Sequence, residues 1–218
     1  MCGRYTLSRI EGLPDFFEVS ETGLPPRFNI APTQQVPVVR LDPTGTREAA
    51  ALRWGLVPYW ARQPPAGAPM INARSETVHR KPAFRDAFQR RRCLVPADGF
   101  YEWRREEGRR QPYLFTLREG GLFAFAGLWD RFVGDDRIVE SFAIVTCPAN
   151  DLVGEIHDRM PVILQRERFD VWLTGPQSLA LQLLTPFESE AMRCVAVSPL
   201  VNNPRNDGEE CVRPVSVG

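Results

Sequence analysis

Short runs of β-branched and aromatic residues, each bounded by glycine or proline, constrain the fold of this chain more than any other feature. Residues 36–41 and 49–54 flank the turn sequence Asp42-Pro43-Thr44-Gly45, which favours a hairpin. Further strands are expected at 93–103, in two parts joined by a turn, and at 113–117, 122–128 and 138–146. This regular spacing predicts an α+β fold with a mainly antiparallel sheet or barrel-like core and flanking helices, rather than βαβ units.

The segments between these strands predict helices and loops. Ser8 can cap a short helix that runs to Phe17, and Pro82 opens a helix that ends in positive charge at 89–92. Residues 25–33 carry three prolines and predict a rigid, extended loop. Later in the chain we expect a short helix ending near 157, a strand at 161–164, helices at 167–173 and 177–184, and a strand at 194–197. Without an internal repeat or a long linker, the 218 residues predict a single domain over 1–218.

The charge balance limits the partners of this chain. Basic and acidic residues number 27 each, the net charge is zero and the sequence pI is near 6.8. Any nucleic-acid binding therefore needs a local basic patch. Lys81 is the only lysine, and the planar guanidinium of the many arginines suits phosphate. A coding bias toward high GC content would produce the same arginine excess.

The cysteines indicate a reducing compartment. Five of them, with no Cys-x-x-Cys pair and no clustering with histidine, argue against a disulfide framework and against a zinc site. We expect no metal and no cofactor. The start of the chain lacks the pattern of a signal peptide, and no apolar run approaches the ~20 residues that span a bilayer. These features predict a cytoplasmic protein without a membrane partner, and a monomer by default.

The first residues, Met1-Cys2-Gly3-Arg4-Tyr5, offer an unusual nucleophile. If Met1 is removed, which the small side chain of Cys2 permits, the chain begins with an amine and a thiol on adjacent carbons. Both groups titrate near neutral pH, so both are partly nucleophilic there. An aldehyde would condense with the amine to an imine, and the thiolate would close a five-membered thiazolidine. Taken alone, position 2 is equally consistent with a small residue at a frayed terminus.

Three further polar residues lie inside otherwise structural segments. Glu102 interrupts the aromatic run at 100–103; if it faces the core its pKa is raised, as a general acid/base near neutral pH requires, whereas strand alternation can also turn it to solvent. His157 is one of two histidines and can equally cap a surface helix, and Asn72 can equally be a turn residue. The aromatic stretch at 54–60 suits either a binding edge or the core.

Together these segments match one family. The start of the chain is followed, in order, by FNIAP at 28–32, WGLVP at 54–58, NARSET at 72–77, ADGFYEW at 97–103, IHDRMP at 156–161 and VNN at 201–203. This series resembles the SOS response-associated peptidase (SRAP) family, whose members act as suicide crosslinkers of abasic sites in single-stranded DNA. The motifs extend from residue 2 to beyond residue 200.

The resemblance implies a role for each catalytic candidate. Cys2 would capture the aldehyde of a ring-opened abasic deoxyribose as a stable thiazolidine and so suppress strand cleavage. Glu102 would open the sugar ring and shuttle protons at the amine, and His157 would hold or protonate the sugar oxygen. Asn72 would position the backbone of Cys2 or the sugar. The family name further implies removal of Met1 by the protein itself, and a lyase activity can accompany crosslinking.

The same resemblance implies a binding surface for single-stranded DNA that contains abasic sites, including junctions with duplex. By resemblance, the phosphates would be gripped by Arg4, Arg74 and Arg159. Four residues would lie along the bound DNA strand: Asn29, Pro32, Trp60 and Trp103. Thr146 would donate a hydrogen bond to a phosphate. Tyr59-Trp60 stands where relatives carry paired tryptophans. The protein would then be associated with the nucleoid when bound to DNA.

Two other functions remain open on sequence grounds. Glutamine amidotransferases of the N-terminal nucleophile type also mature to a terminal Cys-Gly. Their oxyanion hole commonly uses an Asn-Gly dipeptide, and no asparagine here precedes glycine. A non-catalytic DNA-binding module would bind DNA without Cys2, although a net charge of zero leaves it few phosphate contacts.

Overall fold

The structure, a computed structural model, describes residues 2–21, 23–63, 67–106, 109–135 and 137–216. Its strands are β1 (Tyr5–Leu7), β2 (Arg27–Ile30), β3 (Gln35–Leu41), β4 (Arg47–Trp54), β5 (Asn72–Arg74), β6 (Arg92–Ala97), β7 (Gly99–Glu106), β8 (Arg109–Leu117), β9 (Phe123–Val133), β10 (Ile138–Pro148), β11 (Arg159–Pro161), β12 (Ile163–Leu164) and β13 (Met192–Ala196). The helices are α1 (Leu13–Phe17), α2 (Arg85–Arg90), α3 (Asp151–Gly154), α4 (Phe169–Thr174) and α5 (Gln177–Gln182), with 3₁₀ turns at Arg166–Arg168, Ser189–Ala191, Pro199–Asn202 and Glu209–Val212.

Five strands close into a barrel. The order β10-β4-β3-β6-β9 returns to β10, because β10 pairs with β4 on one side and with β9 on the other. The barrel core is aromatic: Tyr5 contacts both Trp54 and Phe125 edge-on, and Trp54 stacks on Phe142. The predicted α+β class with a barrel-like, mainly antiparallel core is confirmed, although β10 runs parallel to β4 and β5.

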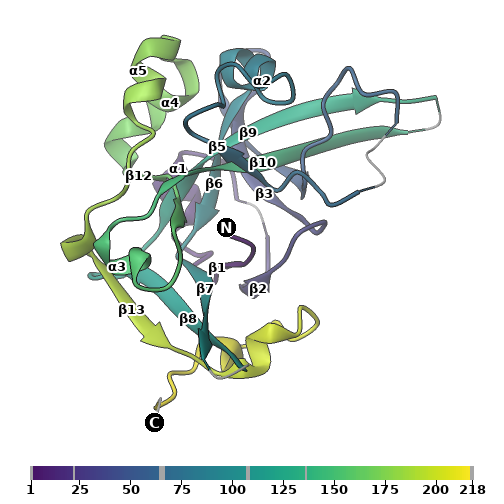
Figure 1. The fold of residues 1–218 in the computed structure, drawn as a ribbon. Coiled ribbons are helices and arrows are strands. Elements are labelled where there is room, and N and C mark those ends of the chain that lie inside the picture. Colours follow the sequence, from purple (N-terminus) through teal and green to yellow (C-terminus); the bar gives the residue numbers. More distant parts are fainter. Residues whose placement is uncertain (1, 22, 64–66, 107–108, 136, 217–218) are drawn as a thin grey trace.

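A second sheet, in the order β13-β8-β7-β1-β2, brings the start of the chain into the middle of the molecule. In Figure 1 the beginning of the chain lies between the barrel and this sheet, rather than trailing away from them. Asp98, between β6 and β7, holds it there: this buried carboxylate accepts hydrogen bonds from the hydroxyl of Thr6 and from the backbone N–H groups of Ser8 and Arg9. Charge-assisted bonds of this kind are among the stronger ones in proteins.

Three of the helices lie together at one end of the barrel (Figure 1). Figure 1 shows α2, α4 and α5 together at that end, and the segment 199–212 at the opposite end. Trp172 of α4 is buried and donates its indole N–H to the carbonyl of Cys93 at 2.9 Å, which fastens α4 to β6. In the part of the chain that the structure describes, no helix combines the length and apolar character needed to cross a membrane.

Several element boundaries differ from the sequence predictions. The first helix begins at Leu13 without a side-chain cap, because the hydroxyl of Ser8 bonds Asp98 instead. The helix expected from Pro82 begins at Arg85, after a series of turns. The strand expected at 161–164 is split between β11, which pairs with β10, and β12, which pairs with β9.

The loop expected at 25–33 contains β2. Ile30 pairs with Tyr5 and Arg27 with Leu7, so β2 becomes the edge of the second sheet. Pairing with the distant N-terminal strand therefore overrides the local signal of the prolines.

Candidate active site and nucleic-acid interface

The register between β1 and β7 determines where Cys2 lies. Tyr5 pairs with Phe100, and the N–H of Tyr101 donates to the carbonyl of Arg4 at 3.0 Å. Continued toward the start of the chain, this antiparallel register sets the residues before Arg4 beside Glu102. Cys2 is fully buried, and its thiol donates to the carbonyl of Arg4. Cys2, the expected nucleophile, is thus held beside the sheet and is not a frayed end.

Asn72 holds the backbone of Cys2. Its side-chain Nδ2 donates to the carbonyl of Cys2 at 2.9 Å. Asn72 opens β5, which runs parallel to β10 with Asn72 opposite Ile144, so its position is set by the barrel. The amide oxygen of the same side chain, Oδ1, is buried and has no hydrogen-bond partner in the described part of the chain. It is therefore a buried acceptor next to the amide group that holds Cys2.

Glu102 faces the interior. It lies on β7 opposite Tyr113 of β8, and only 3% of its surface is exposed. Burial is the main cause that raises the pKa of Glu102 to about 7. The pKa of the Cys2 thiol is also raised, first by burial and then by the charge of Glu102. The carboxyl and the thiol are therefore electrostatic neighbours, and the carboxyl can gain or lose a proton near neutral pH.

His157 lies after α3 and is partly exposed. Its Nδ1 lies 3.0 Å from the N–H of Arg159, from which it accepts when neutral, and 3.0 Å from Oδ1 of Asp158, to which it donates when protonated. In both forms Nε2 carries a proton. Burial, the largest cause, lowers the pKa of His157, while the Asp158 carboxylate opposes that shift. Asp158 also raises the pKa of Glu102, so the turn that carries His157 is within electrostatic range of the pocket.

Two of the residues expected to contact DNA, Arg4 and Trp103, lie together. The guanidinium of Arg4 is 5.8 Å from the ring centroid of Trp103 and donates to Asn29 Oδ1 at 2.8 Å. Asn29 itself is fully buried, and its Nδ2 donates to backbone carbonyls in the segment 201–206. The side chain of Asn29 is thus enclosed and holds Arg4 from beneath, and its expected place along the DNA strand stays a prediction.

A second group joins Arg159 to Thr146 and Glu76. Arg159 forms an ion pair with Glu76 and donates to the carbonyl of Thr146 at 2.6 Å. Arg159 is the main cause that lowers the pKa of Glu76 to about 2. Thr146 is buried and lies under Arg159, and its expected hydrogen bond to a phosphate stays a prediction. Arg74, two positions before Glu76, is exposed.

Trp60 and Pro32 lie on exposed turns. Trp60 is 52% exposed, whereas Trp54, in the same motif region, is fully buried in the barrel. Its neighbour Tyr59 is anchored: the hydroxyl donates to Asp86 at 3.1 Å, and the backbone N–H donates to Asp130 at 3.0 Å. Pro32 is partly exposed in the turn after β2. The hydrogen bonds of Tyr59 therefore hold the turn from which Trp60 extends into solvent.

Sequence reasoning did not single out Glu76 or Asp207. Glu76 is part of the motif at 72–77, which was the available signal, but its pairing with Arg159 is a tertiary contact. Asp207 binds the backbone of Phe28 and Asn29, and no local pattern indicates that. Among the described residues, no group of three or more His, Cys, Asp or Glu side chains could hold a metal ion.

Comparison with known proteins agrees with this architecture. The chain is 39% identical over 224 residues to the abasic site processing protein YoqW of Bacillus subtilis, covering 97% of this chain and 99% of that protein. It is 33% identical to the abasic site processing protein HMCES of Pongo abelii, covering 88% of this chain and 66% of that protein.

Solved structures and a family profile give the same result. A protein from Bacteroides thetaiotaomicron superposes with a TM-score of 0.86 at 24% identity, covering 99% of this chain and all of that one, which shows the shared fold. A Bordetella bronchiseptica protein matches with a TM-score of 0.79 at 30% identity over 90% of this chain and all of that one. The profile described as SOS response associated peptidase (SRAP) matches residues 1–204. The chain belongs to the SRAP family.

Proposed function

We propose that this protein processes abasic sites in single-stranded DNA by capturing the sugar aldehyde covalently on Cys2. The observation that carries the proposal is the fixed position of Cys2, whose carbonyl is held by Asn72 beside a carboxyl with a pKa of about 7. Relatives at 33–39% identity are named abasic site processing proteins, which supports the choice of substrate. Removal of Met1 would give Cys2 the free amine that this chemistry needs.

The first step joins the amine to the sugar. A ring-opened abasic deoxyribose carries an aldehyde, and attack by the amine followed by loss of one water gives an imine. Glu102 takes a proton from the attacking nitrogen and returns one to the departing oxygen, since its pKa lies near the working pH. His157 holds the sugar oxygen with the proton on Nε2, and Asn72 keeps the backbone of Cys2 in place.

The second step closes the ring. The thiol adds to the imine carbon, a C–S bond forms, and the thiol proton is transferred to the nitrogen with Glu102 as the relay. Because burial and the charge of Glu102 raise the pKa of the thiol, the thiol is held protonated until that transfer occurs. The amine therefore reacts first, and the thiazolidine forms only after the aldehyde has been bound. The product retains the 3′ side of the strand, so β-elimination is suppressed.

The strand would lie across the face that carries the arginines. Phosphates would meet Arg4, Arg74 and Arg159, and bases would contact Trp60, Trp103 and Pro32. Base stacking on an aromatic ring is typically worth ~1–3 kcal/mol. Asn29 and Thr146 contribute from beneath, by holding Arg4 and Arg159. The partner in this proposal is single-stranded DNA, including its junctions with duplex, bound by one copy of the single domain.

The test is covalent capture on a defined oligonucleotide. The purified protein, with the absence of Met1 verified by intact mass, is mixed with single-stranded DNA carrying one abasic site. We expect an adduct that survives heat and denaturing electrophoresis, with the mass of protein plus DNA less one water. Cys2→Ala, which keeps the amine, should give only a reversible imine that borohydride can trap.

The control replaces the deoxyribose by tetrahydrofuran, which has no aldehyde and should give no adduct. A wild-type protein that lacks Met1 and forms no adduct would reject the proposal and make a glutaminase assay the next measurement. An adduct that persists in Cys2→Ala without borohydride would move the crosslink to another residue.

A further inference from the structure

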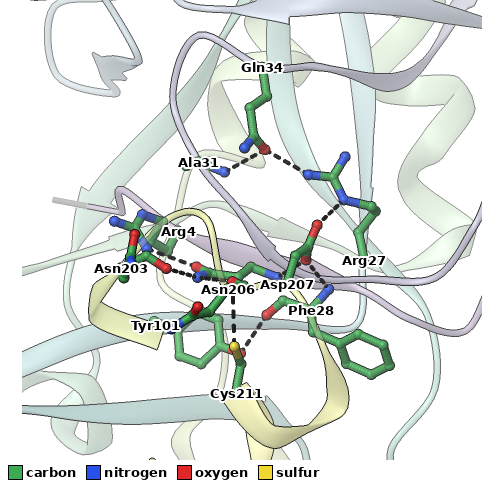
Figure 2. A network of polar contacts seen from close by, with 11 residues as sticks. Arg4, Arg27, Phe28, Ala31, Gln34, Tyr101, Asn203, Asn206, Asp207 and Cys211 are labelled. Atoms are coloured by element: carbon green, nitrogen blue, oxygen red, sulfur yellow. Dashed lines mark hydrogen bonds and ion pairs between the residues drawn. The ribbon is translucent and has the colours of Figure 1, made fainter. Parts of the chain in front are cut away.

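The segment 201–207, called here the C-terminal clasp, is locked onto β2 by Asp207. One carboxylate oxygen of Asp207 accepts hydrogen bonds from the backbone N–H groups of Phe28 and Asn29, at 2.7 and 2.6 Å. The other oxygen forms an ion pair with Arg27. Figure 2 shows Asp207 between Arg27 and the backbone of Phe28, with the clasp folded over the strand. A single side chain thus joins the end of the chain to the edge of the second sheet.

Asn29 locks the same contact from the other side. Its fully buried Nδ2 lies 3.1, 3.1 and 2.6 Å from the carbonyls of Val201, Asn203 and Asn206. Its remaining polar atom, Oδ1, accepts from Arg4 at 2.8 Å. The clasp, β2 and Arg4 therefore share one hydrogen-bond network, whose buried members are costly to separate.

This network orients Arg4, and among the described residues its hydrogen-bond acceptors are uncharged. It donates to Asn29 Oδ1 and, at 2.7 Å, to the carbonyl of Val201, and both acceptors are uncharged. In contrast, Arg27 is paired with Asp207 and Arg159 with Glu76. Burial lowers the pKa of the half-buried Arg4 guanidinium, but an arginine stays protonated at neutral pH, so its charge is available for an external anion.

The clasp also fixes Trp103. The indole N–H of Trp103 donates to Asn202 Oδ1 at 2.6 Å, and the Arg4 guanidinium lies 5.8 Å from the centroid of the Trp103 ring. A cation over an aromatic face adds to the binding of both groups. One segment, separate in the chain from Cys2 and from the strand that carries Glu102, therefore sets the position of two side chains on the proposed DNA surface.

We infer that the C-terminal clasp is a positioning element for strand binding, with Asp207 and Asn29 as its positioning residues. The inference rests on the proposed function, because the strand is the ligand that Arg4 and Trp103 receive. The two concern different quantities. The clasp sets the affinity for DNA, whereas the adduct rate at saturating DNA depends on the residues around Cys2.

The experiment compares Asp207→Ala, Asp207→Asn and Glu209→Ala, measuring the Kd for a tetrahydrofuran oligonucleotide and the adduct rate at saturating abasic DNA. Loss of a negative charge would by itself tighten DNA binding. If the clasp positions Arg4 and Trp103, the change in Kd has the opposite sign. We expect Asp207→Ala to raise the Kd for DNA about tenfold, equivalent to ~1.4 kcal/mol. Asp207→Asn keeps an oxygen acceptor and should have a smaller effect. Glu209→Ala removes an exposed carboxylate from the same end of the chain and should not weaken binding.

A second readout needs no DNA. The indole N–H of Trp103, assigned by its loss in Trp103→Phe, should shift and exchange faster in Asp207→Ala than in Glu209→Ala. If Asp207→Ala does not fold, Asn202→Ala, which removes only the acceptor of Trp103, takes its place. This variant too should raise the Kd and shift the indole signal. An unchanged or lower Kd, or an unmoved indole signal, would overturn the inference. Failure of wild type to form any adduct would instead reject the proposed function, so the two failures are distinguishable.

Discussion

The site around Cys2 and the surface that carries Arg4 and Trp60 are built in different ways. The site is made by strand registers: β1 beside β7 brings Cys2 to Glu102, and β5 beside β10 brings Asn72 to Cys2. The surface is made by turns and side-chain networks, which hold Arg4 and Trp60 at half-buried or exposed positions. Under the proposed function, this difference would be a division of labour, in which the sheet fixes the reacting atoms and the loops determine how DNA is held.

The largest effect expected from this comparison is on the chemistry. Glu102→Gln keeps the shape of the side chain but cannot carry a proton. We expect the adduct rate at neutral pH to fall by about 100-fold, within the range typical of general acid–base catalysis. In wild type the carboxylate form grows as the pH rises through about 7, so the rate should rise through that range and then level off. In Glu102→Gln the adduct rate should no longer rise over this pH range.

The control for Glu102→Gln is Glu155→Gln, on an exposed glutamate that should leave both the rate and its pH profile unchanged. The Kd for the tetrahydrofuran oligonucleotide should not change in Glu102→Gln, because this residue is enclosed. If Glu102→Gln instead bound this oligonucleotide weakly and formed the adduct at the wild-type rate, Glu102 would belong to the binding surface, and the separation between site and surface would be contradicted.

The next effect is on docking. Trp60 is 52% exposed, on a turn held by the hydrogen bonds of Tyr59, so its ring is available for stacking on a nucleobase. We expect Trp60→Ala to raise the Kd for single-stranded DNA about tenfold, inside the ~1–3 kcal/mol typical of base stacking. The adduct rate at saturating DNA should be unchanged, and Trp60→Phe should keep most of the affinity. Leu179→Ala, at another exposed apolar side chain on α5, is the matched control. Equal effects of the two alanine variants would assign Trp60 no stacking role.

The same comparison explains how much the sequence could predict. Strands with local turns, such as β3 and β4, were predicted to within a few residues, because alternation and turn chemistry are local signals. The edge strand β2 was missed because its partner, β1, is distant in the chain. Local pattern also could not show that β10 pairs with both β4 and β9 and so closes the barrel.

For the site, sequence reasoning found the residues but not their relations. The interruption of an aromatic run marked Glu102, and the structure confirms that it faces the interior. Burial of Thr146 and Asn29 was not predictable, because polar residues are most often exposed and only tertiary hydrogen bonds make these two an exception. The roles of all these residues on DNA stay predictions.

The smallest effect concerns the charge of Arg159, and it tests the contrast with Arg4. The Glu76 carboxylate cancels the charge of Arg159, whereas Arg4 keeps its own. Glu76→Gln removes that negative charge and retains an oxygen for the hydrogen bond. We expect DNA affinity to rise two- to threefold and the salt dependence of log Kd to steepen by up to about one, because one more phosphate contact releases one more counterion.

Glu167→Gln, which removes an exposed charge beside α4, should leave both the affinity and the salt slope unchanged. If Glu76→Gln instead weakened binding with no change in the salt slope, Glu76 would serve to orient Arg159, as the clasp orients Arg4. Both arginines would then be oriented for DNA by their protein partners. Arg4 is held by neutral oxygens, whereas Arg159 would have to exchange the Glu76 carboxylate for a phosphate. The salt slope decides between the two arrangements, because orientation alone does not change the number of counterions released.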